Sequence, residues 1–199
     1  MALLGEWQFG AGKNYRDLVI ITLGTGIGTA VLIDGKLLKG KHFQAGNLGG
    51  HFTVNFRGTK CTCGNIGCFE AEASTWRLPS LLRSHSEFVK SSMKDEKVLD
   101  FKTLFLHAGN NDQVAKEVLE HCLSVWSAGI ITMIHAFDPE LIIMSGGIMK
   151  SASGILPAIQ GKINQLAWTP LRKVKLVEAR FIDSAALYGA DFLVRSFLE

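Results

Sequence analysis

The chain has 199 residues, of which 47% are hydrophobic and 20% are charged, and its formal net charge at pH 7 is +3. This length suits one domain with a sizeable core. The positive charges are spread along the chain without a basic run, so composition does not indicate a nucleic-acid or anionic-membrane surface. No apolar stretch reaches the roughly 18 residues of a membrane span, and the first residues do not resemble a secretory signal. We therefore expect a cytoplasmic protein with no nucleic-acid or membrane partner.

The first part of the chain has an antiparallel pattern. Residues 18–23 form an apolar, isoleucine-rich run that predicts a buried strand, and residues 29–33 predict a second strand. Asp34 and Gly35 give a strong two-residue hairpin signal, and residues 36–38 predict the returning strand. The following segment, 40–70, is glycine-rich and polar, and only "FTV" within it suggests a short strand.

From Ala71 the pattern becomes helical, with Ser74 as a candidate N-cap. Residues 84–100 are charged and predict a surface excursion, and 112–138 predict a long helix that becomes apolar on all sides, as a buried helix does. The remaining elements are a strand at 141–144, a helix at 154–166, a strand at 174–179 and a closing helix at 185–197. A hairpin followed by strands that alternate with helices predicts an α/β layered domain.

Three of the four cysteines lie within eight residues, which is unlike the spacing of a disulfide scaffold. Cys61, Cys63 and Cys68, with His51 ten positions upstream of the first, supply three thiolates and one imidazole, a complete tetrahedral set for Zn²⁺. Four protein ligands leave no open position, so the zinc would be structural. The alternatives are unligated loop cysteines and a histidine that only forms hydrogen bonds. Cys122 lies on a helical apolar face and is expected in the core.

A second glycine-rich segment, "LGTGIGTA", joins two predicted strands. Gly24, Gly26 and Gly28 would let backbone N–H groups approach a phosphate, and Thr25 adds a hydroxyl. The alternative is a simple tight turn, because a lone G-x-G-x-G is a weak signal and no helix follows it as in a dinucleotide-binding fold.

The cysteine segment carries a resemblance to a known family. "CTCGNIGCFE" matches the C-x-C-G-x-x-G-C-x-E signature of the ROK family of bacterial sugar kinases and repressors, and "GGHFTV" resembles the family's segment ending in Gly-His. The resemblance implies a ribonuclease H-like, actin-like lobe with a mixed sheet flanked by helices. It also implies a structural Zn²⁺ that holds one wall of a sugar pocket, within a loop at about 45–75. Glu70 would hydrogen-bond sugar hydroxyls there, beside His51 and Asn47.

Two further segments resemble nucleotide motifs of the wider sugar kinase, actin and Hsp70 superfamily. "ITLGTGIGTAVLIDGKLLKG" is similar to the second phosphate motif, and "IIMSGGI" is similar to the adenosine motif. The resemblance therefore implies that ATP with Mg²⁺ is contacted at Gly24, Thr25, Gly26 and Gly28, and at the pair Gly146 and Gly147. "LGEWQFGAGK" and "ALYGA" extend the similarity across essentially the whole chain.

The chain also departs from the family. Many members have a sugar-contacting glutamate three residues before the histidine, where this sequence has Leu48, and Asn47 could replace it only if the backbone shifts. The family's first lobe carries Asp-x-Gly-x-Thr and an Asn-Asp pair whose aspartate is the general base. Neither motif is present, so no catalytic residue is assigned within the 199 residues. We expect residues 1–199 to be the C-terminal lobe of a sugar kinase that has little activity alone.

Three functions remain open at this stage. The first is a lobe of an ATP-dependent hexose or N-acetylhexosamine kinase. The second is the corresponding lobe of a sugar-sensing transcriptional regulator, and the third is a non-catalytic dimerisation or binding module. The expected partners are sugar and ATP, together with a second copy of the chain or an N-terminal lobe supplied in trans. The sequence does not identify the sugar.

Overall fold

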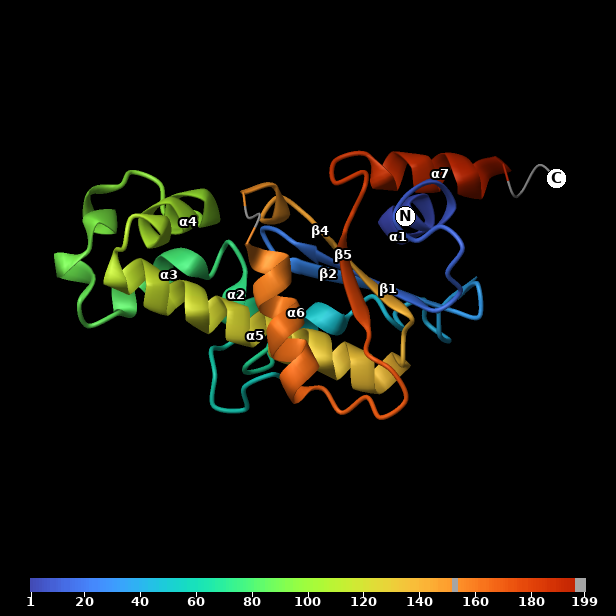
Figure 1. The fold of residues 1–199 in the computed structure, drawn as a ribbon, viewed down its shortest axis with the longest axis horizontal. Helices are drawn as coiled ribbons and strands as arrows, with labels where there is room; N and C mark the ends of the chain where they lie inside the picture. Colours follow the sequence, from blue (N-terminus) through green and yellow to red (C-terminus); the bar gives the residue numbers. More distant parts are fainter. Residues whose placement is uncertain (152–153, 196–199) are drawn as a thin grey trace.

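The computed structural model describes residues 1–151 and 154–195, with a five-stranded mixed sheet at its centre (Figure 1). Its strands, in the spatial order β3-β2-β1-β4-β5, are β1 (Leu18–Leu23), β2 (Ile27–Ile33), β3 (Lys36–Leu37), β4 (Leu141–Ser145) and β5 (Lys175–Glu178). β1, β2 and β3 pair antiparallel, whereas β1, β4 and β5 pair parallel. The predicted mixed sheet and its antiparallel start are confirmed.

The alternation of side chains along β1 explains why helices cover both faces of the sheet. Val19 and Ile21 belong to a core shared with α5 (Gln113–Phe137) and α6 (Ile155–Leu166). Leu18 and Ile20 point to the opposite face and belong to a smaller core with α1 (Ala2–Phe9) and α7 (Ala185–Arg195). Figure 1 shows α1 and α7 together on one side of the sheet and α5 and α6 on the other.

The two ends of the described chain are joined by a buried carboxylate. Glu6, on the unpredicted helix α1, is fully buried and accepts hydrogen bonds from the backbone N–H groups of Ala11 (2.8 Å), Arg180 (3.0 Å) and Phe181 (2.6 Å). These bonds satisfy a charge that would be costly to bury without partners. They also fix α1 against the segment that leads into α7. The last two residues of the predicted closing helix lie outside the described residues.

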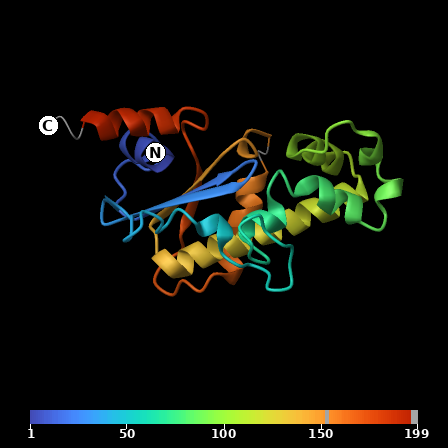
Figure 2. The ribbon, with the colours of Figure 1, turned by 180° about the vertical axis from the view of Figure 1, so that it is seen from behind.

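The segment from β3 to α5 contains three short α-helices, α2 (Phe69–Ala73), α3 (Leu78–Ser84) and α4 (Phe101–Gly109), in addition to 3-10 turns. The predicted strand at 52–54 is wrong, because Thr53 makes only an isolated bridge to Cys68. The predicted cap is also wrong: the Ser74 hydroxyl is buried without a hydrogen-bond partner, and α3 begins four residues later. In Figure 2, which shows the molecule from behind, this segment starts near the sheet and then extends alongside α5.

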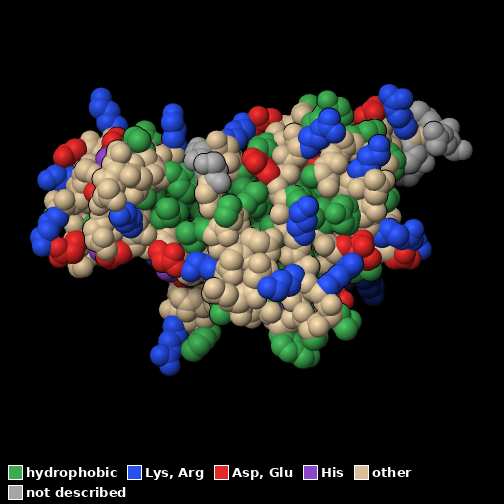
Figure 3. Space-filling model, in the orientation of Figure 1, with side chains coloured by type: hydrophobic (Ala, Val, Ile, Leu, Met, Phe, Trp, Pro, Cys, Tyr) green, Lys and Arg blue, Asp and Glu red, His purple; other side chains and the backbone are tan. Residues whose placement is uncertain are grey.

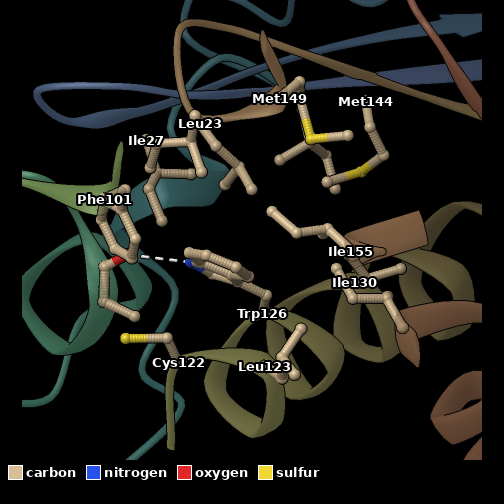
Figure 4. Close-up of a cluster of buried hydrophobic side chains, with 14 of the residues drawn as sticks. Leu23, Ile27, Phe101, Cys122, Leu123, Trp126, Ile130, Met144, Met149 and Ile155 are labelled. Carbon is tan, nitrogen blue, oxygen red and sulfur yellow. Dashed lines mark hydrogen bonds between the residues drawn. The ribbon is translucent and has the colours of Figure 1, made fainter. Parts of the chain in front are cut away.

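Helix α5 is the central core element, as its sequence pattern predicts. Trp126 is fully buried, and its indole N–H donates a hydrogen bond of 2.8 Å to the backbone oxygen of Ala73 in α2 (Figure 4). Cys122 is buried beside it, which confirms its core assignment, and burial raises the pKa of its thiol to about 12. By length and composition α5 could cross a membrane, but 56% of its most apolar window is buried inside the fold. That burial is typical of a core helix.

The N-terminus of α5 is held by Asp112, whose carboxylate accepts hydrogen bonds from the N–H groups of Ala115 (2.9 Å) and Ser92 (2.8 Å) and from the Ser91 hydroxyl. Partial burial opposes ionisation, but these hydrogen bonds outweigh it and lower the pKa of Asp112 to about 2. A folded-state pKa below the unfolded value of about 3.9 means that the ionised carboxylate stabilises the fold above roughly pH 4. That stability is lost as the pH falls towards 2.

We expect Asp112→Ala to lower the free energy of unfolding by about 1–3 kcal/mol at pH 7, because α5 loses its N-cap and because Ser91 and Ser92 lose their hydrogen-bond acceptor. Urea unfolding of both proteins should show the difference shrinking between pH 4 and pH 2. Asp95→Asn is the control, since Asp95 is an exposed residue of the same surface segment, 84–100. It should change the free energy of unfolding by less than about 0.5 kcal/mol. A difference that persists unchanged at pH 2 would contradict the role of the ionised carboxylate.

Candidate functional site

The four predicted metal ligands lie together. The ligand atoms of His51, Cys61, Cys63 and Cys68 are all within 4.8 Å of one another. The Sγ atoms of Cys63 and Cys68 are 3.6 Å apart, and Cys61 Sγ is 3.7 Å from His51 Nδ1. Tetrahedral Zn²⁺ with ordinary bond lengths requires about 3.8 Å between two sulfur ligands and about 3.6 Å between sulfur and nitrogen. The residues therefore fit a zinc ion, with no position left for a water ligand.

Glycines shape the loop that brings these ligands together. Gly64 (φ +94°) and Gly67 (φ +67°) adopt left-handed backbone conformations that other residues rarely adopt. A Cβ on Gly67 would lie 1.5 Å from the backbone oxygen of Asn55, so no other residue fits there. The Cys61 N–H donates to the backbone oxygen of Asn65 at 2.8 Å, which closes a tight turn over residues 61–65.

The cysteines differ in their tendency to ionise. Burial, with the nearby thiols of Cys63 and Cys61, raises the pKa of Cys68 to about 12. A backbone hydrogen bond from Asn65 lowers the pKa of the exposed Cys63. A zinc ion bound here would have to displace a tightly held proton from Cys68, so we expect the affinity of the site for zinc to increase with pH.

Glu72, which the sequence analysis did not single out, holds residues 55–59 of the cysteine loop in place. Its buried carboxylate accepts hydrogen bonds from the Thr59 N–H (2.6 Å) and the Asn55 side-chain amide (3.2 Å). Gly58 permits this approach, since a Cβ there would lie 2.3 Å from Glu72 Oε1. Glu72 is one of two glutamates among the apolar residues of "FEAEA", and this apolar setting is the one sequence signal that it has partners in the interior.

Glu70 connects the cysteine loop to the glycine turn. Its Oε2 accepts a hydrogen bond of 2.9 Å from the Ile27 N–H, and its Oε1 lies 3.4 Å from the Trp76 indole nitrogen. Gly26 lies directly against this carboxylate, because a Cβ there would be 2.3 Å from Oε2. A carboxylate has about four acceptor positions, so Glu70 can still accept hydrogen bonds from ligand hydroxyls.

The predicted nucleotide residues divide into two groups. Gly24, Thr25 and Gly147 line one cavity of about 450 Å³ at the end of the sheet. The other three shape its surroundings: Gly26 makes room for Glu70, Gly28 pairs with Thr22 in the sheet, and Gly146 (φ +98°) packs against the Leu23 backbone. Sequence reasoning missed the other residues that line this cavity: Thr75, Asp100, Phe101, Lys102 and Ile148.

Asn47 is bonded within its own loop. Its side-chain amide donates a hydrogen bond of 3.0 Å to the backbone oxygen of Phe43, and neighbouring Leu48 is 47% exposed. A separate cavity of about 620 Å³ lies beside His135 and Trp168, and it contains none of the predicted site residues.

Comparison with known proteins gives a consistent result. A family profile described as "ROK family" matches residues 1–196. The chain is 30% identical to the glucokinase of Thermotoga maritima over 97% of this chain and 62% of that protein. It is 29% identical to the xylose repressor of Bacillus subtilis over 96% of this chain and 47% of that protein.

Among solved structures, the fold is similar to a ROK family glucokinase from Streptomyces griseus in complex with glucose and AMPPNP. The TM-score is 0.82 at 28% sequence identity, over 98% of this chain and 65% of that chain. The 199 residues thus span between about half and two thirds of the length of these relatives. The sequence signature, the actin-like fold and the His-Cys₃ cluster agree with the profile match, and the chain belongs to the ROK family.

Proposed function

We propose that this chain supplies the zinc-loop and nucleotide-contacting lobe of an ATP-dependent hexose or N-acetylhexosamine kinase. The observation that carries the proposal is the position of Glu70. Its carboxylate extends from the cysteine loop to the Ile27 N–H of the glycine turn, so a sugar at the loop and a phosphate at the turn would be neighbours. Neighbouring binding sites for sugar and phosphate are what phosphoryl transfer requires.

In this proposal the four ligands hold a structural Zn²⁺, which stiffens the loop when bound and does not activate water. His51, Asn47 and Glu70 line the sugar site, with Glu70 accepting bonds from sugar hydroxyls. Leu48 replaces a carboxylate that many family members use, so the sugar remains open between hexoses and N-acetylhexosamines. ATP with Mg²⁺ lies along the cavity that contains Thr25 and Gly147.

The general base belongs, in this proposal, to an N-terminal lobe outside the 199 residues, supplied in trans or by a longer protein. Half of a cleft does not enclose ATP, Mg²⁺ and sugar together, so the isolated chain should transfer phosphate slowly or not at all. A coupled assay on the purified chain tests this expectation. Robust ATP-dependent phosphorylation of glucose or N-acetylglucosamine would contradict it. We place the protein in the cytoplasm, without nucleic-acid or membrane partners, and as a homodimer or paired with such a lobe.

The second candidate is the sugar-binding lobe of a transcriptional regulator, which the similarity to the xylose repressor supports. Isothermal titration of the chain with glucose, N-acetylglucosamine and ATP–Mg²⁺ separates the candidates. Binding of both sugar and ATP supports the kinase lobe. Binding of sugar alone favours the regulator, and binding of neither favours a non-catalytic dimerisation module.

A further inference from the structure

We propose that Lys102 binds the phosphate groups of the nucleotide, although sequence analysis placed it beyond every predicted site. The inference rests on the proposed nucleotide site and adds a residue to it. Lys102 is the second residue of α4 and lines the same cavity as Gly24 and Thr25. Within the part of the chain that the structure describes, it is the only lysine or arginine that lines this cavity, and it forms no ion pair there.

Local electrostatics favour an anion at this point. The N-terminus of a helix carries a partial positive charge, so a lysine in the first turn of α4 is disfavoured by roughly 0.3–1 kcal/mol unless an anion lies nearby. Asp100 also lines the cavity, but its Oδ1 accepts hydrogen bonds from the Thr103 N–H (2.8 Å) and hydroxyl (2.9 Å) and caps the helix. Its carboxylate is therefore engaged by α4 itself, and the Lys102 ammonium group has no such partner.

A second cavity continues the first. It has a volume of about 750 Å³, shares Asp100 and Lys102 with the first, and includes Lys150 from the segment after β4. Lys150 is paired with Asp183, so its charge is already compensated. Lysine and arginine side chains are scattered over this face of the molecule in Figure 3, without one large basic patch. Lys102 is exposed, and its place among the residues that line this cavity, and not a general positive surface, is what selects it.

The ligand chemistry follows from the walls. The Gly24 N–H is already bonded to the Gly26 oxygen, so the donors left at this turn are the Thr25 N–H and hydroxyl. Together with the Lys102 ammonium group on the same cavity, they suit an extended polyanion such as a triphosphate. Neutral adenosine would gain nothing from Lys102. The contact therefore predicts different effects of one substitution on ATP and on adenosine.

The test is an NMR titration of the whole chain with ATP–Mg²⁺ and, separately, with adenosine, using amide shifts at Gly24, Thr25 and Gly147 to detect weak binding. Lys102→Ala should weaken ATP binding about tenfold and leave adenosine binding unchanged, because a charge-assisted contact is lost. Lys102→Arg should retain most of the affinity. Lys94→Ala is the matched control, since Lys94 is exposed on the same excursion and lines neither cavity.

Three results of this titration would contradict the proposed role of Lys102. If Lys102→Ala binds ATP as the wild type does, the inference is overturned while the proposed nucleotide site stands. If the variant loses ATP and adenosine equally, the contact is not to phosphate and the inference is again overturned. If the wild type shows no shifts with ATP at any concentration, the nucleotide half of the proposed function fails and this inference fails with it.

Discussion

Cys68→Ser should reduce bound zinc from one equivalent per chain to nearly none and should lower the melting temperature substantially. Cys68 is fully buried at the start of α2, and its thiolate would complete the tetrahedral set. If zinc is present at about 1,000 times its dissociation constant, its loss removes about 4 kcal/mol of stability. For a domain of this size that corresponds to a fall of roughly 8–16 °C. Elemental analysis and thermal unfolding measure the two effects.

Cys122→Ala is the matched control, because it removes the one cysteine that lies outside the cluster. It should retain a full equivalent of zinc and lose only the stability of a small core cavity, about 1–2 kcal/mol. A chelator should lower the melting temperature of the wild type and leave Cys68→Ser unaffected. Retention of one zinc by Cys68→Ser would show that Cys68 is not a required ligand. An unchanged melting temperature of the wild type after chelation would show that the metal does not support the fold.

Long and strongly patterned elements could be predicted from the sequence. The strands at 18–23 and 141–144 and the helix at 112–138 are there because their apolar residues fix both the type of element and its burial. Helices α1 and α4 were missed because each has fewer than ten residues, too few for a clear helical pattern, although α4 has a local cap at Asp100. α1 depends on bonds from Glu6 to Arg180 and Phe181, which no local pattern indicates.

The candidate site divides in the same way. The four metal ligands lie within 18 positions of one another in the sequence, so spacing indicated the three cysteines and offered His51, which the family resemblance then favoured as the fourth ligand. Glu72 and Lys102 could not be found in this manner, because their importance comes from contacts made after folding. Gly26 was predicted to admit a phosphate, and the structure gives an additional reason for it, the close approach of Glu70.

Glu70→Gln should weaken sugar binding about ten- to a hundredfold, with little change in stability. The amide oxygen can still accept the Ile27 N–H bond, so the glycine turn keeps its partner. The lost charge removes hydrogen bonds to sugar hydroxyls that are each worth about 1.5–3 kcal/mol when the acceptor is ionised. The amide nitrogen would also face the Trp76 indole N–H, which is a donor and gives no compensating bond. NMR titration with glucose and N-acetylglucosamine provides the measurement.

Two further variants test whether a loss of sugar binding in Glu70→Gln comes from the carboxylate at this site. Glu120→Gln makes the same chemical change on an exposed part of α5 and should leave sugar affinity unchanged. Glu70→Ala should lose the sugar as Glu70→Gln does and also lose about 1–3 kcal/mol of stability, because the Ile27 N–H is left without an acceptor. If Glu70→Gln binds sugar within twofold of the wild type, the carboxylate does not contact the sugar. The link between the cysteine loop and the glycine turn would then be structural only, and the sugar site would have to lie elsewhere.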